Sequence, residues 1–256
     1  MKSKLFAFMK AVLVVTGIGC ALSAVWIVYH YFHTDPRFNL RQVSVQGTKL
    51  VAEEEVMSRI QLNTQSNTNI FAVNMDEVRV HVEEIPWVRY ATVQRVLPDE
   101  IVITIVERKE AGLARIDGQI SAFDNEAAIL QQDDSSTDQF PILIGLRLND
   151  TEGNLKKIAL YTRAMSELKG AGLSEITVDQ NNDVSVVTDE DPLVVNLGAG
   201  DFQARWNVYM KLKNKITAEY KDAMRVDLRF KNKVIISTHD DDDGGKVIWD
   251  GKKKSL

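Results

Sequence analysis

The sequence almost lacks cysteine. Its single one, Cys20, lies in an apolar segment near the N-terminus, so the rest of the chain contains none. Disulfide bonds and cysteine nucleophiles are therefore excluded from that body, and a zinc site there would depend on histidines and carboxylates. The chain also has only four histidines and a net charge of −5. It lacks the basic excess that nucleic-acid binding requires.

Motifs of the common catalytic chemistries are missing too. The sequence has no glycine-rich phosphate loop and no HExxH zinc motif, and no nucleophile motif accompanies His81 or His239. The LGAGD segment at 197–201 is too short for a dinucleotide fingerprint. The four aspartates at 240–243 lack the spaced ligands of a calcium loop. We therefore predict a protein that is not an enzyme and that uses no cofactor and no metal.

One long apolar run is present, at residues 11–32, and it contains no Asp, Glu, Lys or Arg. As an α-helix this run would be about 33 Å long, which matches the ~30 Å hydrocarbon core of a bilayer. Its length and its bulky aromatic end argue against a cleaved signal peptide. The apolar stretch that continues beyond Cys20 disfavours a lipoprotein signal. We predict a retained, single-pass transmembrane helix.

The charges on the two sides of this run differ, and the difference predicts its orientation. The segment that follows the run, 33–40, holds only one Asp and one Arg. By the positive-inside rule, residues 1–10 form a cytoplasmic stub and the body of the chain lies on the other side of the membrane. Three lysines precede the run: Lys2, Lys4 and Lys10.

Residues 37–108 predict a small domain with the order β-α-α-β-β. Apolar residues in alternation indicate its strands, and apolar residues three or four apart indicate its helices. Pro86 ends the second helix, and Pro98 lies in a turn between the last two strands. Arg95 and Glu107 fall on neighbouring strands, where they could pair. The predicted elements are a strand at 38–47, helices at 52–62 and 74–85, and strands at 87–96 and 101–106.

Residues 109–237 predict a larger mixed α/β domain, in which short strands form an extended sheet and two helices cover it. The first helix, 155–169, has an apolar stripe that includes Leu155 and Ile158, and the second lies at 202–220. Residues 238–256 are expected to be a disordered tail, because runs of like charge flank glycines there. The fold class is therefore α+β.

Two motifs in the first domain carry a family resemblance. FxLxxVxVxG close behind the anchor, followed by PWVRxAxVxRxLPDxIxIxIxE, resembles the POTRA domain of the FtsQ/DivIB family of bacterial cell-division proteins. In the second domain, VDLRF at 226–230 and LGxGD before the last helix resemble the family's β domain. We expect the POTRA motif residues to be mainly structural: Phe38, Val43, Val45, Gly47, Pro86, Trp87, Val88, Arg95 and Pro98.

The resemblance implies a non-enzymatic scaffold in the inner membrane, with its body in the periplasm, that links early and late division proteins at the septum. It also implies FtsB and FtsL homologues as partners and, through them, the septal peptidoglycan synthase. Two other classes stay open: a membrane-anchored cell-envelope enzyme and a POTRA-containing secretion component.

For the partner site we predict strand addition, because a last strand at a sheet edge leaves backbone groups unpaired. If both C-terminal strands are interior instead, the partner edge lies elsewhere. The candidate edge residues are Val226, Leu228, Arg229, Phe230, Val234, Ile235, Ile236 and Ser237.

Overall fold

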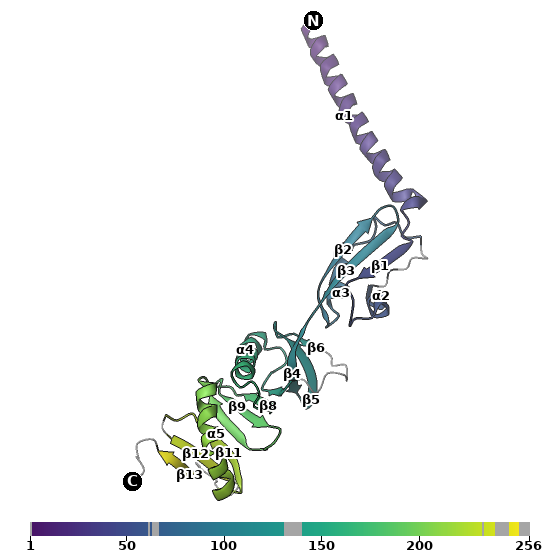
Figure 1. Ribbon diagram of the computed structural model, residues 1–256. Helices are drawn as coiled ribbons and strands as arrows, with labels where there is room; N and C mark the ends of the chain where they lie inside the picture. Colours follow the sequence, from purple (N-terminus) through teal and green to yellow (C-terminus); the bar gives the residue numbers. More distant parts are fainter. Residues whose placement is uncertain are drawn as a thin grey trace. The chain divides into compact units, whose positions relative to one another are not determined.

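The computed structural model describes residues 2–60, 62, 67–130, 140–231, 233–238 and 246–250. The chain divides into two compact units, Met1–Arg108 and Lys109–Leu256. The first contains the N-terminal helix and the small predicted domain, and the second contains the larger sheet (Figure 1). Both units combine helices with a sheet, as the α+β class predicted from the sequence requires.

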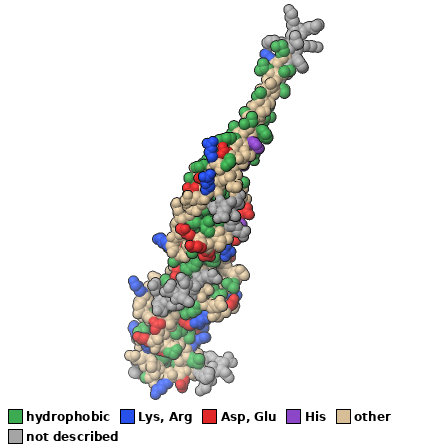
Figure 2. Space-filling model, turned by 90° about the vertical axis from the view of Figure 1, so that its right-hand side faces the viewer, with side chains coloured by type: hydrophobic (Ala, Val, Ile, Leu, Met, Phe, Trp, Pro, Cys, Tyr) green, Lys and Arg blue, Asp and Glu red, His purple; other side chains and the backbone are tan. Residues whose placement is uncertain are grey.

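Helix α1, Lys2–Thr34, is long enough to cross a membrane. Its segment Val12–Thr34 has a mean hydropathy of 2.2, and none of it is buried by the rest of the protein. Hydrophobic side chains lie along this part of α1 on the face that Figure 2 shows. An apolar surface of this size favours a nonpolar environment. Within the described residues, α1 is the one helix with the length and composition of a membrane span.

The end of α1 packs on the small domain through three phenylalanines. The ring centroid of Phe32 lies 5.1 Å from that of Phe38 and 5.7 Å from that of Phe71. The side-chain amide of Asn69 also donates a hydrogen bond of 2.9 Å to the backbone carbonyl of Phe32. This bond satisfies one of the carbonyls that the last helical turn leaves without an intrahelical partner.

The small domain has the predicted order β-α-α-β-β. Strand β3 is central: β1 pairs with it in parallel and β2 pairs with it in antiparallel. The parallel pair requires a crossover, which the two helices supply. The elements are β1 Gln42–Gln46, α2 Glu53–Ile60, α3 Met75–Glu83, β2 Val88–Val96 and β3 Glu100–Glu107.

The core of this domain lies between the helices and one face of the sheet. Val56 on α2 and Val78 on α3 are buried against alternate residues of β3. The alternation follows from the pleat of a strand, which sends every second side chain to the same face. The buried positions of β3 are Ile101, Ile103 and Ile105.

In the second unit the described strands form one ten-stranded sheet, in the order β13-β12-β11-β10-β9-β8-β7-β4-β5-β6. Its first elements are β4 Glu110–Ile116, β5 Gln119–Asp124, β6 Ile129–Leu130, β7 Ile142–Ile144, α4 Thr151–Glu167 and β8 Leu173–Val178. Those that follow are β9 Val184–Thr188, β10 Val194–Gly198, α5 Phe202–Glu219, β11 Ala223–Asp227, β12 Lys233–Thr238 and β13 Lys246–Asp250.

Two parallel strand pairs in this sheet explain the two helices. Helix α4 connects β7 to β8, and helix α5 connects β10 to β11. Parallel neighbours need such long crossovers, whereas the antiparallel pairs β8–β9 and β11–β12 need only turns. The helices bury one face of the sheet and complete a single core.

The buried face of α4 differs from the predicted one. Leu155 is exposed, whereas Lys157 and Tyr161 are buried together with Ile158. The Lys157 ammonium donates to the carbonyl of Gly145, and the Tyr161 hydroxyl donates to the carbonyl of Pro141 at 2.8 Å. A prediction of the buried face from apolar residues alone overlooks lysine and tyrosine. Their apolar stems can be buried once their polar ends have hydrogen-bond partners.

The C-terminal tail contains a strand that the sequence analysis missed. Residues 246–250 form β13, which pairs antiparallel with β12, so the prediction of disorder is wrong for this segment. The sequence there, KVIWD, is rich in residues that favour strands. The charged runs at 240–243 and 252–254, which suggested disorder, lie outside the described residues.

Candidate partner-binding site

Gly47 in the small domain has a backbone conformation that would be strained in any other residue. Its φ is +87°, and a Cβ atom there would overlap the backbone carbonyl of Ile105 on β3. Only glycine adopts such a φ without cost. Gly47 therefore lets the chain turn immediately beside the sheet after β1.

Arg95 and Glu107 do not pair with each other. The antiparallel register places Arg95 opposite Ile101, near the far end of β3 from Glu107. Arg95 donates to the backbone carbonyls of Ile70 at 3.0 Å and Val73 at 2.6 Å. The prediction of a cross-strand pair is thus wrong, because each side chain binds the backbone of a loop.

The Glu107 carboxylate accepts three backbone N–H bonds, from Lys49 at 2.7 Å, Leu50 at 2.8 Å and Val51 at 2.9 Å. Burial opposes its ionisation, but these hydrogen bonds and the charge of Lys49 outweigh burial and lower the pKa of Glu107 below 4.5. Glu107 therefore holds the β1–α2 loop in its ionised form.

The other POTRA-motif side chains lie in or around the same core. Val88 is buried, and the half-buried residues Phe38, Val43, Val45 and Trp87 pack against the core. Two prolines are exposed at chain reversals: Pro86 follows α3, and Pro98 lies between β2 and β3.

In the second unit, four of the eight candidate edge residues point into the core. Their side chains are almost entirely covered by the domain itself. Ile235 and Ser237 alternate with two of them along β12 and are half-buried. The four buried residues are Val226, Leu228, Val234 and Ile236.

Strand β12 is not a free edge. It pairs with β11 on one side and with β13 on the other. In the described part of the chain, the sheet ends at β13 and at the two-residue strand β6. The prediction of a free β12 edge is therefore wrong, and the interior alternative is the one observed.

Arg229 is held by two carboxylates. Its guanidinium lies 2.7 Å from Asp227 and 2.8 Å from Asp183, which belongs to the turn between β8 and β9. The hydrogen bonds to Asp227 and then to Asp183 raise the pKa of Arg229 above its usual value. Arg229 thus ties the chain beyond β11 to a neighbouring turn.

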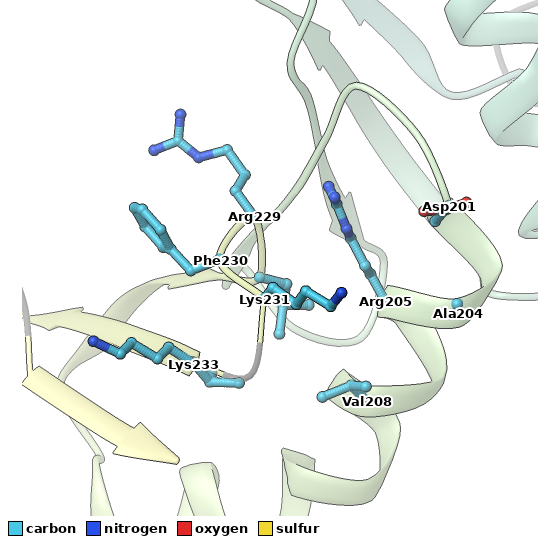
Figure 3. Close-up of a pocket in the computed structure, with 10 residues that line it drawn as sticks. Asp201, Ala204, Arg205, Val208, Arg229, Phe230, Lys231 and Lys233 are labelled. Carbon is cyan, nitrogen blue, oxygen red and sulfur yellow. The ribbon is translucent and has the colours of Figure 1, made fainter. Parts of the chain in front are cut away.

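A groove of about 430 Å³ lies between the start of α5 and the β11–β12 turn (Figure 3). Val208 on α5 and the buried side chains of Leu228 and Val234 supply its apolar wall. Phe230 stands at the turn with 48% of its surface exposed. The remaining lining residues are Asp201, Ala204, Arg205, Arg229, Lys231 and Lys233.

The groove is positively charged. Lys231 and Lys233 are exposed and form no ion pair with any described carboxylate, whereas Arg205 is bound to the carbonyl of Leu197. Two exposed ammonium groups beside an exposed aromatic ring suit a ligand that is both apolar and acidic. Sequence reasoning singled out Phe230 but not the lysines or Val208, because α5 and the turn meet only in the folded domain.

The described residues include no group of three or more His, Cys, Asp or Glu that could hold a metal ion. The aspartates at 240–243 lie outside those residues. The lysines and Phe230 of the groove do not form an acid–base or nucleophile arrangement.

Comparison with known proteins identifies both units. A model described as "POTRA domain, FtsQ-type" matches residues 38–108, and one described as "Cell division protein FtsQ/DivIB, C-terminal" matches residues 106–229. The Koribacter versatilis "Cell division protein FtsQ" is 31% identical over 243 residues, which cover 89% of this chain and 70% of that protein.

Two more distant relatives agree. The protein of the same name from Syntrophotalea carbinolica is 22% identical, over 70% of this chain and 68% of its own length. The Clostridium tetani "Cell division protein DivIB" is 29% identical over 39% of this chain and 37% of its own length. The C-terminal domain match ends at residue 229, so β12 and β13 lie beyond it.

Proposed function

This chain belongs to the FtsQ/DivIB family of cell-division proteins, and from that premise we propose that it is a non-enzymatic membrane scaffold of the divisome. Proteins of this family act at the division septum, and a role in interactions among divisome proteins follows from membership. The single apolar helix supports attachment to the membrane by one span.

The proposed orientation has the N-terminus in the cytoplasm and both folded domains in the periplasm. Three lysines before the apolar helix support it, because positive charge is retained on the cytoplasmic side. The partners we propose are homologues of FtsB and FtsL, through which the protein would be linked to the septal peptidoglycan synthase.

The groove beside the last strands of the sheet is the observation that supports a partner site in this domain. A partner segment would pair its backbone at the C-terminal end of the sheet. Its apolar side chains would contact Phe230 and Val208, and its acidic side chains would contact Lys231 and Lys233. Charge pairs of this kind speed association and fix orientation.

The binding test uses the full-length protein in detergent with the FtsB and FtsL homologues of the same bacterium. The double variant Lys231→Glu/Lys233→Glu should lower the affinity at least about tenfold, because it reverses two charges that face the partner. A matched control is Lys211→Glu/Lys221→Glu, which changes exposed lysines away from the groove. Equal loss in both variants would show that net charge matters and the groove does not.

The cellular test is depletion of the protein. We expect filamentous cells without completed septa, because the remaining division proteins would not be connected. Normal septation after depletion would contradict the proposed scaffold role.

A further inference from the structure

Strand β13 is attached to the rest of the domain on one side only. It is five residues long and pairs only with β12 among the described strands. The pairs are Lys233↔Asp250, Val234↔Trp249, Ile235↔Val247 and Ile236↔Lys246, and the register shifts between the second and the third. A shift of this kind interrupts the ladder of hydrogen bonds.

Strand β12 keeps its place without β13. Its side chains Val234 and Ile236 are buried in the core, and its other edge pairs with β11 along most of its length. Stability in a sheet is uneven, and a short terminal strand opens at a lower free energy than the strands beneath it. Removing β13 would therefore expose one edge of β12 and leave the core intact.

The register also relates this edge to the groove. Asp250 at the end of β13 lies opposite Lys233, and Lys233 lines the groove. Any strand that takes the place of β13 along β12 therefore reaches the groove with one of its ends. A single extended segment could use both the β12 edge and the Lys231–Lys233 charges.

We propose that β13 is an exchangeable strand: in the free protein it occupies the β12 edge, and a partner's strand displaces it. This inference rests on the proposed function, in which a partner binds at this end of the sheet. The partner that fits is an extended segment with apolar residues in alternation and an acid near the end that meets Lys233.

Exchange makes binding depend on the chain's own tail. Seven residues, 239–245, connect β12 to β13, so the tail competes as an intramolecular strand at an effective concentration of the order of millimolar. A partner's apparent affinity equals its intrinsic affinity multiplied by the fraction of molecules in which β13 is open. The covered edge also protects the sheet from pairing with other chains.

The first test is a disulfide that locks β13 in place. Lys233→Cys/Asp250→Cys joins residues that the register sets opposite, at a Cα separation compatible with a disulfide. The background is the full chain with Cys20→Ala, which has no other thiol. With the FtsB homologue as probe, we expect the oxidised protein to lose binding at least about tenfold relative to the same protein reduced.

Both redox states carry the Lys233→Cys substitution. A difference in binding between them therefore reports the disulfide and not the loss of the lysine. The single variants Lys233→Cys and Asp250→Cys, treated with the same oxidant, control for oxidation. Equal binding by the oxidised and reduced double variants would overturn the proposal.

The second test shortens the chain after Thr238. If β13 competes with the partner, the shortened protein should bind the FtsB homologue about tenfold more tightly than the full chain. If the partner instead pairs with the outer edge of β13, the shortened protein should lose binding. That loss would overturn the exchange proposal and leave the proposed scaffold function standing.

The third test needs no partner. The β12 amides that face β13 should exchange their hydrogens by local opening, at least about tenfold faster than the amides of β10 and β11. Forming the disulfide in the Lys233→Cys/Asp250→Cys variant should abolish that difference. Exchange only through global unfolding would overturn the inference. Failure of every variant to bind FtsB and FtsL homologues, with local opening observed, would count against the proposed function alone.

Discussion

Charged side chains have different tasks in the POTRA domain and in the C-terminal domain. In the POTRA domain, Arg95 and Glu107 bind backbone groups of two loops around a three-stranded sheet. In the C-terminal domain, Lys231 and Lys233 pair with no described carboxylate and line a groove near the end of a ten-stranded sheet. Charges bound to backbone support the fold, whereas the two lysines beside the sheet edge are the charges that we propose a partner contacts.

The two sheets end differently as well. In the POTRA domain the outer strands β1 and β2 flank β3, whose alternate residues are buried under two helices. In the C-terminal domain the sheet continues beyond the residues that the family model matches, and among the described strands it ends at β13, a strand from the tail. We therefore expect substitutions in the first domain to change stability, and substitutions near the second edge to change binding.

The largest stability effect should come from Gly47→Ala. The new Cβ would overlap the Ile105 carbonyl at a φ of +87°, which should cost about 3 kcal/mol or more of unfolding free energy. Gly118→Ala in the β4–β5 turn is the matched control, because φ is +83° there and the space is open. It should cost about 1 kcal/mol. Urea unfolding monitored by hydrogen exchange in each domain measures both, and equal losses would contradict the assigned clash.

A smaller loss should follow from Arg95→Met. The variant leaves the carbonyls of Ile70 and Val73 without their donor, which should cost about 2 kcal/mol of unfolding free energy. Thermal and urea unfolding of the full chain measure the loss. Wild-type stability in this variant would show that water replaces the guanidinium and that the two bonds add nothing to the fold.

Glu107→Gln should cost about 1.5 kcal/mol at pH 7, because a neutral amide oxygen accepts the three N–H bonds less strongly than a carboxylate. Because the pKa of Glu107 is lowered in the folded state, the carboxylate stabilises the folded state at pH values above the ordinary pKa of a glutamate. This contribution is lost as the pH falls through the lower, folded-state pKa. The difference between wild type and variant should therefore narrow below pH 4.5 in urea unfolding measured across pH. A constant difference would contradict this assignment.

The smallest stability effect should come from Lys231→Met/Lys233→Met. Both lysines are exposed and unpaired among the described residues, so unfolding free energy should change by less than about 0.5 kcal/mol. Binding of the FtsB homologue should still weaken, most clearly at low salt. A stability loss comparable with that of Arg95→Met would remove the contrast between the two domains.

Much of the fold could be predicted because its signals are local. The apolar run at 11–32 corresponds closely to the span Val12–Thr34. The alternation of Ile101, Ile103 and Ile105 identified the buried face of β3. The Asp117-Gly118 pair marked the β4–β5 turn, where both residues have a positive φ.

The candidate site was predicted less well. Val234 and Ile236 belong to the right strand, but their side chains are buried and β13 covers the strand's edge. The neighbours of Arg95 and Glu107 lie in loops 22 to 58 residues away along the chain. No spacing rule connects residues so far apart.

By itself, the sequence determined which segment suits a membrane, the order of helices and strands in the POTRA domain, and the family. These follow from length, periodicity and short motifs, all of which act between near neighbours in the chain. Tertiary structure alone decided that the tail strand covers β12, that Lys231 and Lys233 meet α5 at a groove, and that Arg95 and Glu107 bind separate loops. Each of these depends on strand register and on the packing of distant segments, which no local pattern specifies.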